Sequence, residues 1–277
     1  MSDVNEGKEY PAVNLRARSS RNDFVAGAIR KSPERGGPPK PVRTDGFEAG
    51  LRDLAARIVD CLGRKENVVA AVCGKTGSGK SEMARQLHGR LSEGGIGATI
   101  VGTDDFYING DPERPQDRDL DLERVHAAIA SLLAGRASGD YAPAKVVIVE
   151  GIHTIADGAV GRRPDIRAYI EADFEQRIGR RIIRDARSGY RSIKAALDVA
   201  IFLATEHPQA FYRFEMEPDL SRVDAVIVND YREPGDPRII VHGDRLIFSV
   251  DGKVIESRRL TPEEKGAVLK IGVVEQD

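Results

Sequence analysis

Eight consecutive residues in this sequence have the types and the spacing to hold the phosphates of a nucleotide. Three glycines allow a loop to turn its backbone N–H groups inward, because glycine tolerates positive φ and close approach to a ligand. A lysine in such a loop reaches the β- and γ-phosphates, and the hydroxyl that follows it ligates Mg²⁺. We therefore predict a phosphate-binding loop (P-loop), with ATP and Mg²⁺ as cofactors, made of Gly74, Lys75, Thr76, Gly77, Ser78, Gly79, Lys80 and Ser81.

Acidic residues follow two apolar runs, at the points where buried strands would end. Asp104 and Asp105 come after residues 98–101, and Glu150 comes directly after residues 146–149. Ligands of an open α/β sheet bind at the carboxyl ends of its strands. A carboxylate there can accept the proton of an attacking hydroxyl, and another can hold metal-bound water. The alternative is a helix cap, or a solvated turn in the case of the aspartate pair.

A dense group of basic residues lies between positions 177 and 191. Its members are Arg177, Arg180, Arg181, Arg184, Arg187 and Arg191. On a helix, the first four lie at i, i+3, i+4 and i+7 and share one face. Guanidinium groups bind phosphate oxygens through charge-assisted hydrogen bonds, so this group suits a transferring phosphoryl group. A solvated helix face and a contact with RNA are the alternatives.

Short apolar runs alternate with helical patterns along the middle of the chain. The apolar runs predict buried strands at residues 68–72, 98–101, 146–149, 168–170 and 225–228. Apolar residues at helical spacing predict helices at residues 51–62, 82–91, 122–133, 177–187 and 193–203. This alternation predicts an α/β fold with three layers, α/β/α, and a mostly parallel sheet.

The two ends of the chain differ from this middle part. Residues 1–45 are rich in turn formers and poor in apolar residues, which predicts a flexible N-terminal arm. Near the C-terminus, Asp251-Gly252 between two strand-like segments predicts a β-hairpin of residues 245–250 and 253–257. Residues 238–241 suit a third antiparallel strand.

Taken in order, the motifs resemble the uridine kinase and phosphoribulokinase superfamily. Thr-Asp-Asp-Phe-Tyr at 103–107 looks like the family's Asp-Ser-Phe-Tyr element, and Glu-Gly-Ile at 150–152 looks like the end of its metal-binding strand. Arg-Arg-Ile-Ile-Arg-Asp at 180–185 is similar to its Arg-Arg-x-x-Arg-Asp pattern. The resemblance implies a P-loop kinase core at 46–231 with an arginine-rich lid around 175–192, followed by a C-terminal β-hairpin extension at 232–277.

The resemblance also implies roles for single residues. The family's general base maps onto Asp104, and Asp105 replaces the family's serine, so that either aspartate remains open as the base. Tyr107 maps onto an aromatic position of the acceptor site, and Glu150 with Ser81 onto the magnesium site. In the family, the lid arginines stabilise charge on the transferring phosphoryl group. We thus expect Arg180 and Arg184 at the nucleotide, Arg184 and Lys80 in catalysis, and Arg187 at the acceptor.

The sequence departs from the uridine kinases at the elements that contact the nucleoside. Their Asp-His-Pro element is replaced by Arg-Asp-Leu-Asp-Leu at 118–122, and residues 140–141 run almost directly into the next strand. The base-contacting hairpin is therefore missing or much shortened, which favours a smaller acceptor. Asp119 suits an acceptor hydroxyl, or adds charge at the N-terminus of the following helix. His153 either touches the substrate or is a loop or core histidine.

Bulk properties narrow the class of protein. The 277 residues carry a net charge of −2, which gives no long-range attraction to nucleic acid or to a membrane surface. Cys61 and Cys73 suit buried, reduced thiols better than a disulfide framework. The N-terminus is unlike a secretory signal, and no apolar run reaches the roughly 18 residues of a membrane span. We expect a cytoplasmic protein whose partner is a small molecule, without nucleic acid or membrane, and leave a homo-oligomer open.

We therefore expect an ATP-dependent kinase that acts on a hydroxyl of a nucleoside, a sugar, a sugar phosphate or a related metabolite. Two other classes stay open. One is a regulatory ATP-binding protein that has no acceptor. The other is an RNA-associated ATPase or 5′-hydroxyl kinase, which would use the arginines to bind RNA phosphates.

Overall fold

The computed structural model describes residues 41–108, 119–155, 158, 160–161, 163–206, 219–229, 237–250, 252–270 and 273–276. The chain divides into two units, Met1–Gly37 and Pro38–Asp277, and all the described residues belong to the second unit. Residues 1–40 of the predicted arm and Arg118 lie outside the described residues.

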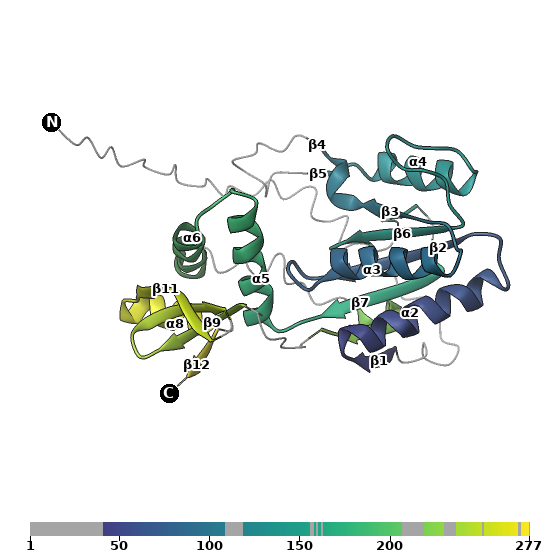
Figure 1. Ribbon diagram of the computed structural model, residues 1–277. Helices are drawn as coiled ribbons and strands as arrows, with labels where there is room; N and C mark the ends of the chain where they lie inside the picture. Colours follow the sequence, from purple (N-terminus) through teal and green to yellow (C-terminus); the bar gives the residue numbers. More distant parts are fainter. Residues whose placement is uncertain are drawn as a thin grey trace. The chain divides into compact units, whose positions relative to one another are not determined.

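Within the described residues, six parallel strands form a central sheet in the order β1-β8-β7-β2-β6-β3 (Figure 1). They are β1 (Val42–Asp45), β2 (Val68–Gly74), β3 (Ala98–Gly102), β6 (Val146–Gly151), β7 (Ile166–Glu171) and β8 (Ala225–Val228). Every residue of β2 is buried, as expected for a valine- and alanine-rich strand that is covered on both faces. All the strands predicted for the core are present.

Helices cover both faces of this sheet (Figure 1). On one face, α2 (Phe47–Leu62) and α3 (Lys80–Glu93) form a buried cluster with alternate residues of β2, to which Leu87 contributes. On the other face, α4 (Leu122–Leu133) places Val125 in a cluster with Val69 of β2 and with Val147 and Val149 of β6. Because successive side chains of a strand point to opposite faces, one apolar strand supplies both interfaces. The predicted three-layer α/β/α fold is confirmed.

A separate four-stranded sheet follows near the C-terminus, in the order β11-β10-β9-β12. The strands β9 (Pro237–His242), β10 (Arg245–Val250) and β11 (Lys253–Arg259) are antiparallel, whereas β12 (Val274–Gln276) pairs in parallel with β9. The predicted hairpin and the third antiparallel strand are confirmed. The sequence pattern did not predict α8 (Pro262–Lys270) or β12, because both segments are short and largely polar.

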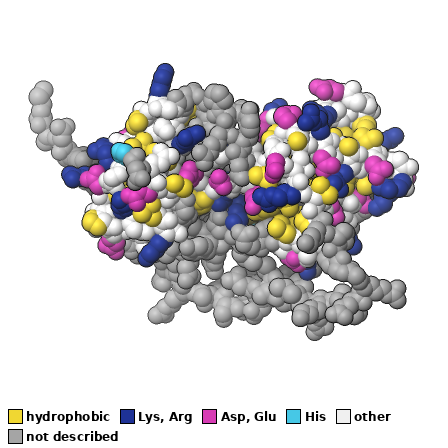
Figure 2. Space-filling model, turned by 90° about the horizontal axis from the view of Figure 1, so that it is seen from below, with side chains coloured by type: hydrophobic (Ala, Val, Ile, Leu, Met, Phe, Trp, Pro, Cys, Tyr) yellow, Lys and Arg dark blue, Asp and Glu magenta, His cyan; other side chains and the backbone are white. Residues whose placement is uncertain are grey.

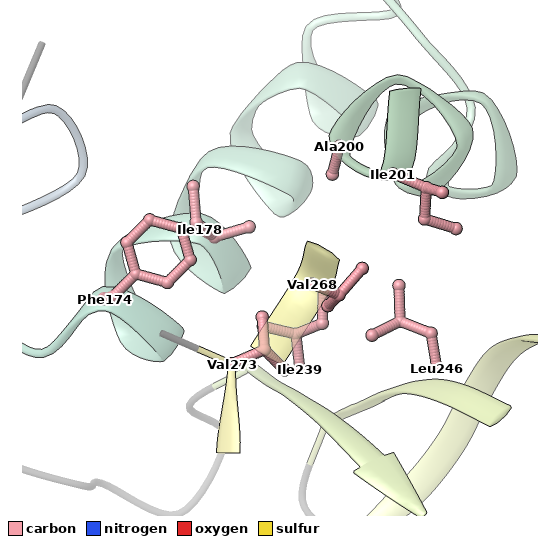
Figure 3. Close-up of a pocket in the computed structure, with 8 residues that line it drawn as sticks. All are labelled: Phe174, Ile178, Ala200, Ile201, Ile239, Leu246, Val268 and Val273. Atoms are coloured by element: carbon pink, nitrogen blue, oxygen red, sulfur yellow. The ribbon is translucent and has the colours of Figure 1, made fainter. Parts of the chain in front are cut away.

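The C-terminal sheet shares its core with α5 (Phe174–Arg187) and α6 (Ile193–Glu206). Figure 3 shows how these elements surround one small apolar space, lined by Phe174, Ile178, Ala200, Ile201, Ile239, Leu246, Val268 and Val273. The approach is close, since a Cβ on Gly179 of α5 would lie 2.8 Å from the carbonyl oxygen of Pro237. The predicted hairpin therefore belongs to a sheet separate from the central one, and this sheet packs on the arginine-bearing helix α5.

The first strand lies inside the range that was predicted as a flexible arm. Residues 42–45 form β1, which pairs in parallel with β8, so the end of that range belongs to the central sheet. The pattern misses this strand because Val42 is its one large apolar residue and because its pairing is a tertiary contact.

The cysteines and the charged surface residues are the features that composition let us predict. Both cysteines are free, with Cys73 buried in β2 and Cys61 half-buried in α2. Basic and acidic side chains are interspersed on the described part of the face in Figure 2. None of the helices in the described ranges is long and apolar enough to cross a membrane.

Candidate active site

The P-loop connects β2 to α3 at the carboxyl edge of the central sheet. Gly77 and Gly79 have φ angles of 78° and 97°, a left-handed backbone that favours glycine. The Ser78 N–H donates to the carbonyl of Lys75 at 3.1 Å, and α3 begins at Lys80. The first N–H groups of a helix lack intrahelical acceptors and carry the positive end of its dipole, which suits an anion. The predicted nucleotide-binding loop is present in this structure.

Lys80 and Ser81 begin α3 beside Glu150, near the end of β6. The strand register places Glu150 between β2 and β3, level with Gly102 of β3. The Ser81 hydroxyl donates a hydrogen bond to Glu150 Oε1 at 3.1 Å. Burial lowers the pKa of Lys80 and raises the pKa of Glu150, and the attraction between the two opposite charges opposes both shifts. The loop lysine and the strand carboxylate thus share one partly dehydrated site.

The Glu150 carboxylate has an oxygen left for a metal ion. Its Oε2 atom is buried and has no hydrogen-bond partner within the described structure. A free carboxylate oxygen beside a serine hydroxyl is the kind of donor set that Mg²⁺ uses, together with water and substrate phosphates. The described residues contain no group of three His, Cys, Asp or Glu side chains that could hold a metal by themselves. The site therefore fits a Mg²⁺ ion that Ser81 and Glu150 hold jointly with a nucleotide.

The two predicted aspartates lie in η1 (Thr103–Phe106), a 3₁₀ helix that follows β3 directly. Asp104 is exposed, and its charge acts on both Lys80 and Glu150. Asp105 accepts a hydrogen bond from the Tyr141 hydroxyl at 2.6 Å. The structure therefore separates these neighbours, because the Asp105 carboxylate has a tyrosine partner whereas Asp104 interacts with the lysine of the P-loop.

A small aromatic group lies beside the aspartates. The ring of Tyr141 stacks on Phe106 with the centroids 6.1 Å apart, and the guanidinium of Arg124 lies 5.6 Å from the Phe106 centroid. Burial raises the pKa of Tyr141, and the hydrogen bond to Asp105 raises it further. The Tyr141 hydroxyl consequently stays protonated at neutral pH and remains a hydrogen-bond donor.

Two short strands bring the other predicted acceptor residues next to η1. The strand β4 (Tyr107–Ile108) pairs with β5 (Asp119–Leu120), so that Tyr107 lies opposite Leu120 and Ile108 opposite Asp119. His153 lies in the turn after β6, where burial lowers its pKa and the charge of Asp104 opposes that shift. The residues predicted for the acceptor therefore gather beside the aspartates, with the exception of Arg187.

The arginines of α5 do not form one set. Arg177 is 3 % exposed and donates to the carbonyl oxygens of Ala172 at 3.1 Å and Thr76 at 3.4 Å. Arg180 is half-buried and lies 3.5 Å from the carbonyl oxygen of Asn229. Arg177 was grouped with the others as part of one basic face, whereas the structure buries it behind the P-loop. These two arginines contact the protein backbone.

Arg184 and Arg187 lie towards the C-terminal end of α5 and are exposed. Arg184 pairs with Asp185 at 3.2 Å, and its charge also acts on Lys80. Among the contacts of the described residues, none connects Arg187 to the P-loop or to the aspartates. The structure thus brings Arg184 towards the nucleotide side and leaves Arg187 at the outer end of the helix.

Sequence reasoning missed two residues of this region, Asn229 and Tyr141. Asn229 is 6 % exposed and donates through Nδ2 to the carbonyl of Ser78 at 2.7 Å. Its position in the sequence could have indicated it, because Asn229 is the polar residue directly after the apolar strand β8. Tyr141 carried no comparable signal, because its partner Asp105 is distant in the sequence.

The chain is similar to several known kinases. A family model described as "Phosphoribulokinase / Uridine kinase family" matches residues 131–230. The uridine kinase of Geobacillus kaustophilus is 28 % identical over 160 residues, which cover 48 % of this chain and 74 % of the relative. The uridine kinase of Halobacterium salinarum is 27 % identical over 183 residues, which cover 56 % and 77 %. The chain is thus similar to the phosphoribulokinase and uridine kinase family over residues 131–230, and to uridine kinases over about half of its length.

A solved structure described as a "possible uridine kinase" from Bacillus stearothermophilus is 18 % identical, covers 64 % of this chain and 98 % of its own, and has a TM-score of 0.34. At the place where the sequence departs from the uridine kinases, residues 134–145 connect α4 to β6. An isolated β-bridge between Ser138 and Tyr141 lies in that connection. The connection therefore carries Tyr141, the partner of Asp105, to the acceptor side of the site.

Proposed function

We propose that this kinase transfers the γ-phosphate of ATP to a hydroxyl group of a small molecule, with Asp104 as the general base. The observation that carries this proposal is the position of Asp104 at the end of β3, where its charge acts on Lys80 and Glu150. A carboxylate at this place is suited to accept a proton from a hydroxyl that attacks a phosphate held by the P-loop.

Each residue then has a defined part in the reaction. The P-loop N–H groups and Lys80 hold the phosphates, and Ser81 with Glu150 holds Mg²⁺, which supplies neutralisation of the phosphate charge when bound. The acceptor oxygen forms a bond to the γ-phosphorus while the bond from that phosphorus to the β–γ bridging oxygen breaks. ADP leaves with the electron pair, and the hydroxyl proton passes to the Asp104 carboxylate. Arg184 and Arg180 add positive charge near the transferring group.

Asp104 is favoured over Asp105 as the base. The Tyr141 hydroxyl already occupies one oxygen of Asp105, which gives that carboxylate a positioning role beside the acceptor. Asp104 lies in the same short helix and is exposed as well, but no side chain of the described residues donates a hydrogen bond to it, so its carboxylate is open to a substrate hydroxyl.

The chemistry of the acceptor side supports a polyhydroxylated or phosphorylated small molecule. Carboxylates such as Asp105 and Asp119 accept hydrogen bonds from hydroxyl groups, and Arg124 can pair with an anionic group. The curated relatives named above are uridine kinases, so uridine is the first acceptor to test. Sugars and sugar phosphates follow, since carboxylates on this side suit hydroxyl groups and Arg124 suits a phosphate.

Acceptor-dependent release of ADP tests the proposed function. The purified protein is incubated with ATP and Mg²⁺ and with nucleosides, pentoses, pentose phosphates, pantothenate or glycerate, and the products are weighed by mass spectrometry. We expect one class to stimulate ADP release and to gain one phosphoryl group. ADP release that no hydroxyl compound stimulates would contradict the proposal and favour a regulatory ATP-binding protein.

A further inference from the structure

Two buried polar side chains each contact one carbonyl group of the P-loop. They come from two different segments that follow the loop far along the sequence. Asn229, directly after β8, donates through Nδ2 to the Ser78 carbonyl at 2.7 Å. Arg177, in the first turn of α5, donates through Nη1 to the Thr76 carbonyl at 3.4 Å. The two side chains are 6 % and 3 % exposed. Neither belongs to the P-loop motif, and both are buried against the loop.

These contacts orient the N–H groups on which phosphate binding depends. In a trans peptide the C=O and N–H groups point in opposite directions, so fixing one fixes the other. The Ser78 carbonyl held by Asn229 therefore sets the direction of the Gly79 N–H. In the same way, the Thr76 carbonyl held by Arg177 sets the direction of the Gly77 N–H. Both N–H groups then point away from the buried side chains.

The glycines of the loop are matched to these two neighbours. A Cβ on Gly79 would lie 2.5 Å from Nδ2 of Asn229, and a Cβ on Gly77 would lie 2.3 Å from the backbone oxygen of Arg177. Positive φ alone already favours glycine at both positions. The close approach adds a second reason, because the neighbours occupy the space that a side chain would need.

Asn229 is itself held at both of its backbone polar groups. Its N–H donates to the carbonyl of Glu171 at 2.7 Å, at the end of the neighbouring strand β7. Its own carbonyl lies 3.5 Å from the guanidinium of Arg180. The amide is therefore directed at the P-loop by the central sheet on one side and by α5 on the other.

We propose that Asn229 and Arg177 are positioning residues that preorganise the P-loop for the phosphates of ATP. Preorganised donors increase affinity because no free energy is spent on ordering them when the ligand binds. This inference rests on the proposed function in that a nucleotide occupies the loop. It adds two residues outside the motif that set its affinity, and neither of them contacts the reacting atoms.

Asn67 provides a matched control at the opposite edge of the same sheet. It is half-buried just before β2 and donates through Nδ2 to the Leu133 carbonyl at 3.4 Å. Replacing Asn67 or Asn229 by aspartate removes a donor and places a negative charge against a carbonyl oxygen. Both substitutions can reduce stability, whereas loss of ATP affinity is expected at Asn229 alone.

Calorimetric titration with ATP and Mg²⁺, in the absence of any acceptor, gives the test. We expect Asn229→Asp and Asn229→Ala to raise the Kd for ATP by about 10- to 100-fold, with the Kd of Asn67→Asp unchanged. An unchanged Kd for the Asn229 variants, or an equal loss in Asn67→Asp, would overturn the proposal. If Asn229→Asp does not fold, Asn229→Ser is measured by the same criteria.

Arg177→Lys is the second variant, because it keeps the charge and loses the planar guanidinium. We expect a rise in the Kd for ATP and in the KM for ATP, with a smaller change in kcat. The reverse pattern, a lower kcat at unchanged KM, would overturn the positioning role of Arg177. These titrations stay informative if the proposed function fails, since that failure would appear as wild-type protein that binds ATP without acceptor-dependent turnover.

Discussion

The nucleotide side and the acceptor side of this site are built in different ways. The nucleotide side consists of the P-loop and the ends of β2 and β6, with the P-loop one continuous segment on long, buried elements. The acceptor side consists of η1, the two-residue strands β4 and β5, and Tyr141 from another connection. Its central hydrogen bond, from Tyr141 to Asp105, joins residues 36 positions apart.

This difference indicates which side of the site can change its specificity for the acceptor. The donor side depends on a rigid strand–loop–helix unit, so its chemistry is the same wherever that unit occurs. The acceptor side depends on contacts between short connections, which tolerate substitution and insertion far better than the core does. Variants on the two sides should therefore separate ATP binding from acceptor selection.

Of the three variants Lys80→Met, Glu150→Gln and Tyr141→Phe, replacing Lys80 by methionine should have the largest effect. The variant keeps the length of the side chain and loses the charge that holds the phosphates, so kcat should fall by about 10²- to 10³-fold. Steady-state kinetics with saturating acceptor measure this loss. Lys65→Met is the control, because Lys65 precedes β2 at the end away from the P-loop, where its exposed ammonium group pairs with the buried carboxylate of Asp165 at 2.5 Å. Similar kinetics for the two variants would contradict the assignment of Lys80.

Glu150→Gln tests the metal end of the nucleotide side. The amide keeps the size of the side chain and an acceptor for the Ser81 hydroxyl, and loses the negative charge. We expect the Mg²⁺ concentration that gives the half-maximal rate to rise by about 10- to 100-fold. Glu171→Gln is the control, since Glu171 ends β7 and pairs with Arg43 at 2.6 Å. An unchanged requirement for Mg²⁺ in Glu150→Gln would remove this residue from the metal site.

Tyr141→Phe should give a smaller and more selective effect on the acceptor side. The ring that stacks on Phe106 is kept, and the hydrogen bond to Asp105 is lost. We expect the KM for the acceptor to rise by about 10-fold, with little change in the Kd for ATP. Equal losses in both quantities would show that the two sides are not separable, and the comparison would fail.

Much of the fold follows from local patterns in the sequence. The helix α4 and the strand β8 have the predicted bounds, Leu122–Leu133 and Ala225–Val228, because their apolar periodicity is local and strong. The strand β1 escapes prediction because its four residues are held by pairing with β8. No pattern within residues 42–45 reports that tertiary contact.

The candidate site also has one part that local sequence patterns predict and another part that they do not. The P-loop can be predicted residue by residue, because phosphate binding requires glycine, lysine and serine at this spacing within one short segment. The contacts of Thr76 with Arg177 and of Ser78 with Asn229 span 101 and 151 positions, so the sequence order hides them. Arg177 was grouped with exposed arginines because helical spacing gives the face of a residue and not what covers that face. Such neighbours are known only when the chain is folded.

Asp104→Asn beside Asp105→Asn is the most direct test of the proposed reaction, measured as acceptor-dependent kcat together with the Kd for ATP. The two variants make the same change at adjacent positions of η1. We predict that Asp104→Asn lowers kcat by about 10²- to 10⁴-fold and leaves the Kd for ATP nearly unchanged, with a clearly smaller loss of kcat for Asp105→Asn. A near-normal kcat for Asp104→Asn, or a larger loss for Asp105→Asn, would contradict Asp104 as the general base.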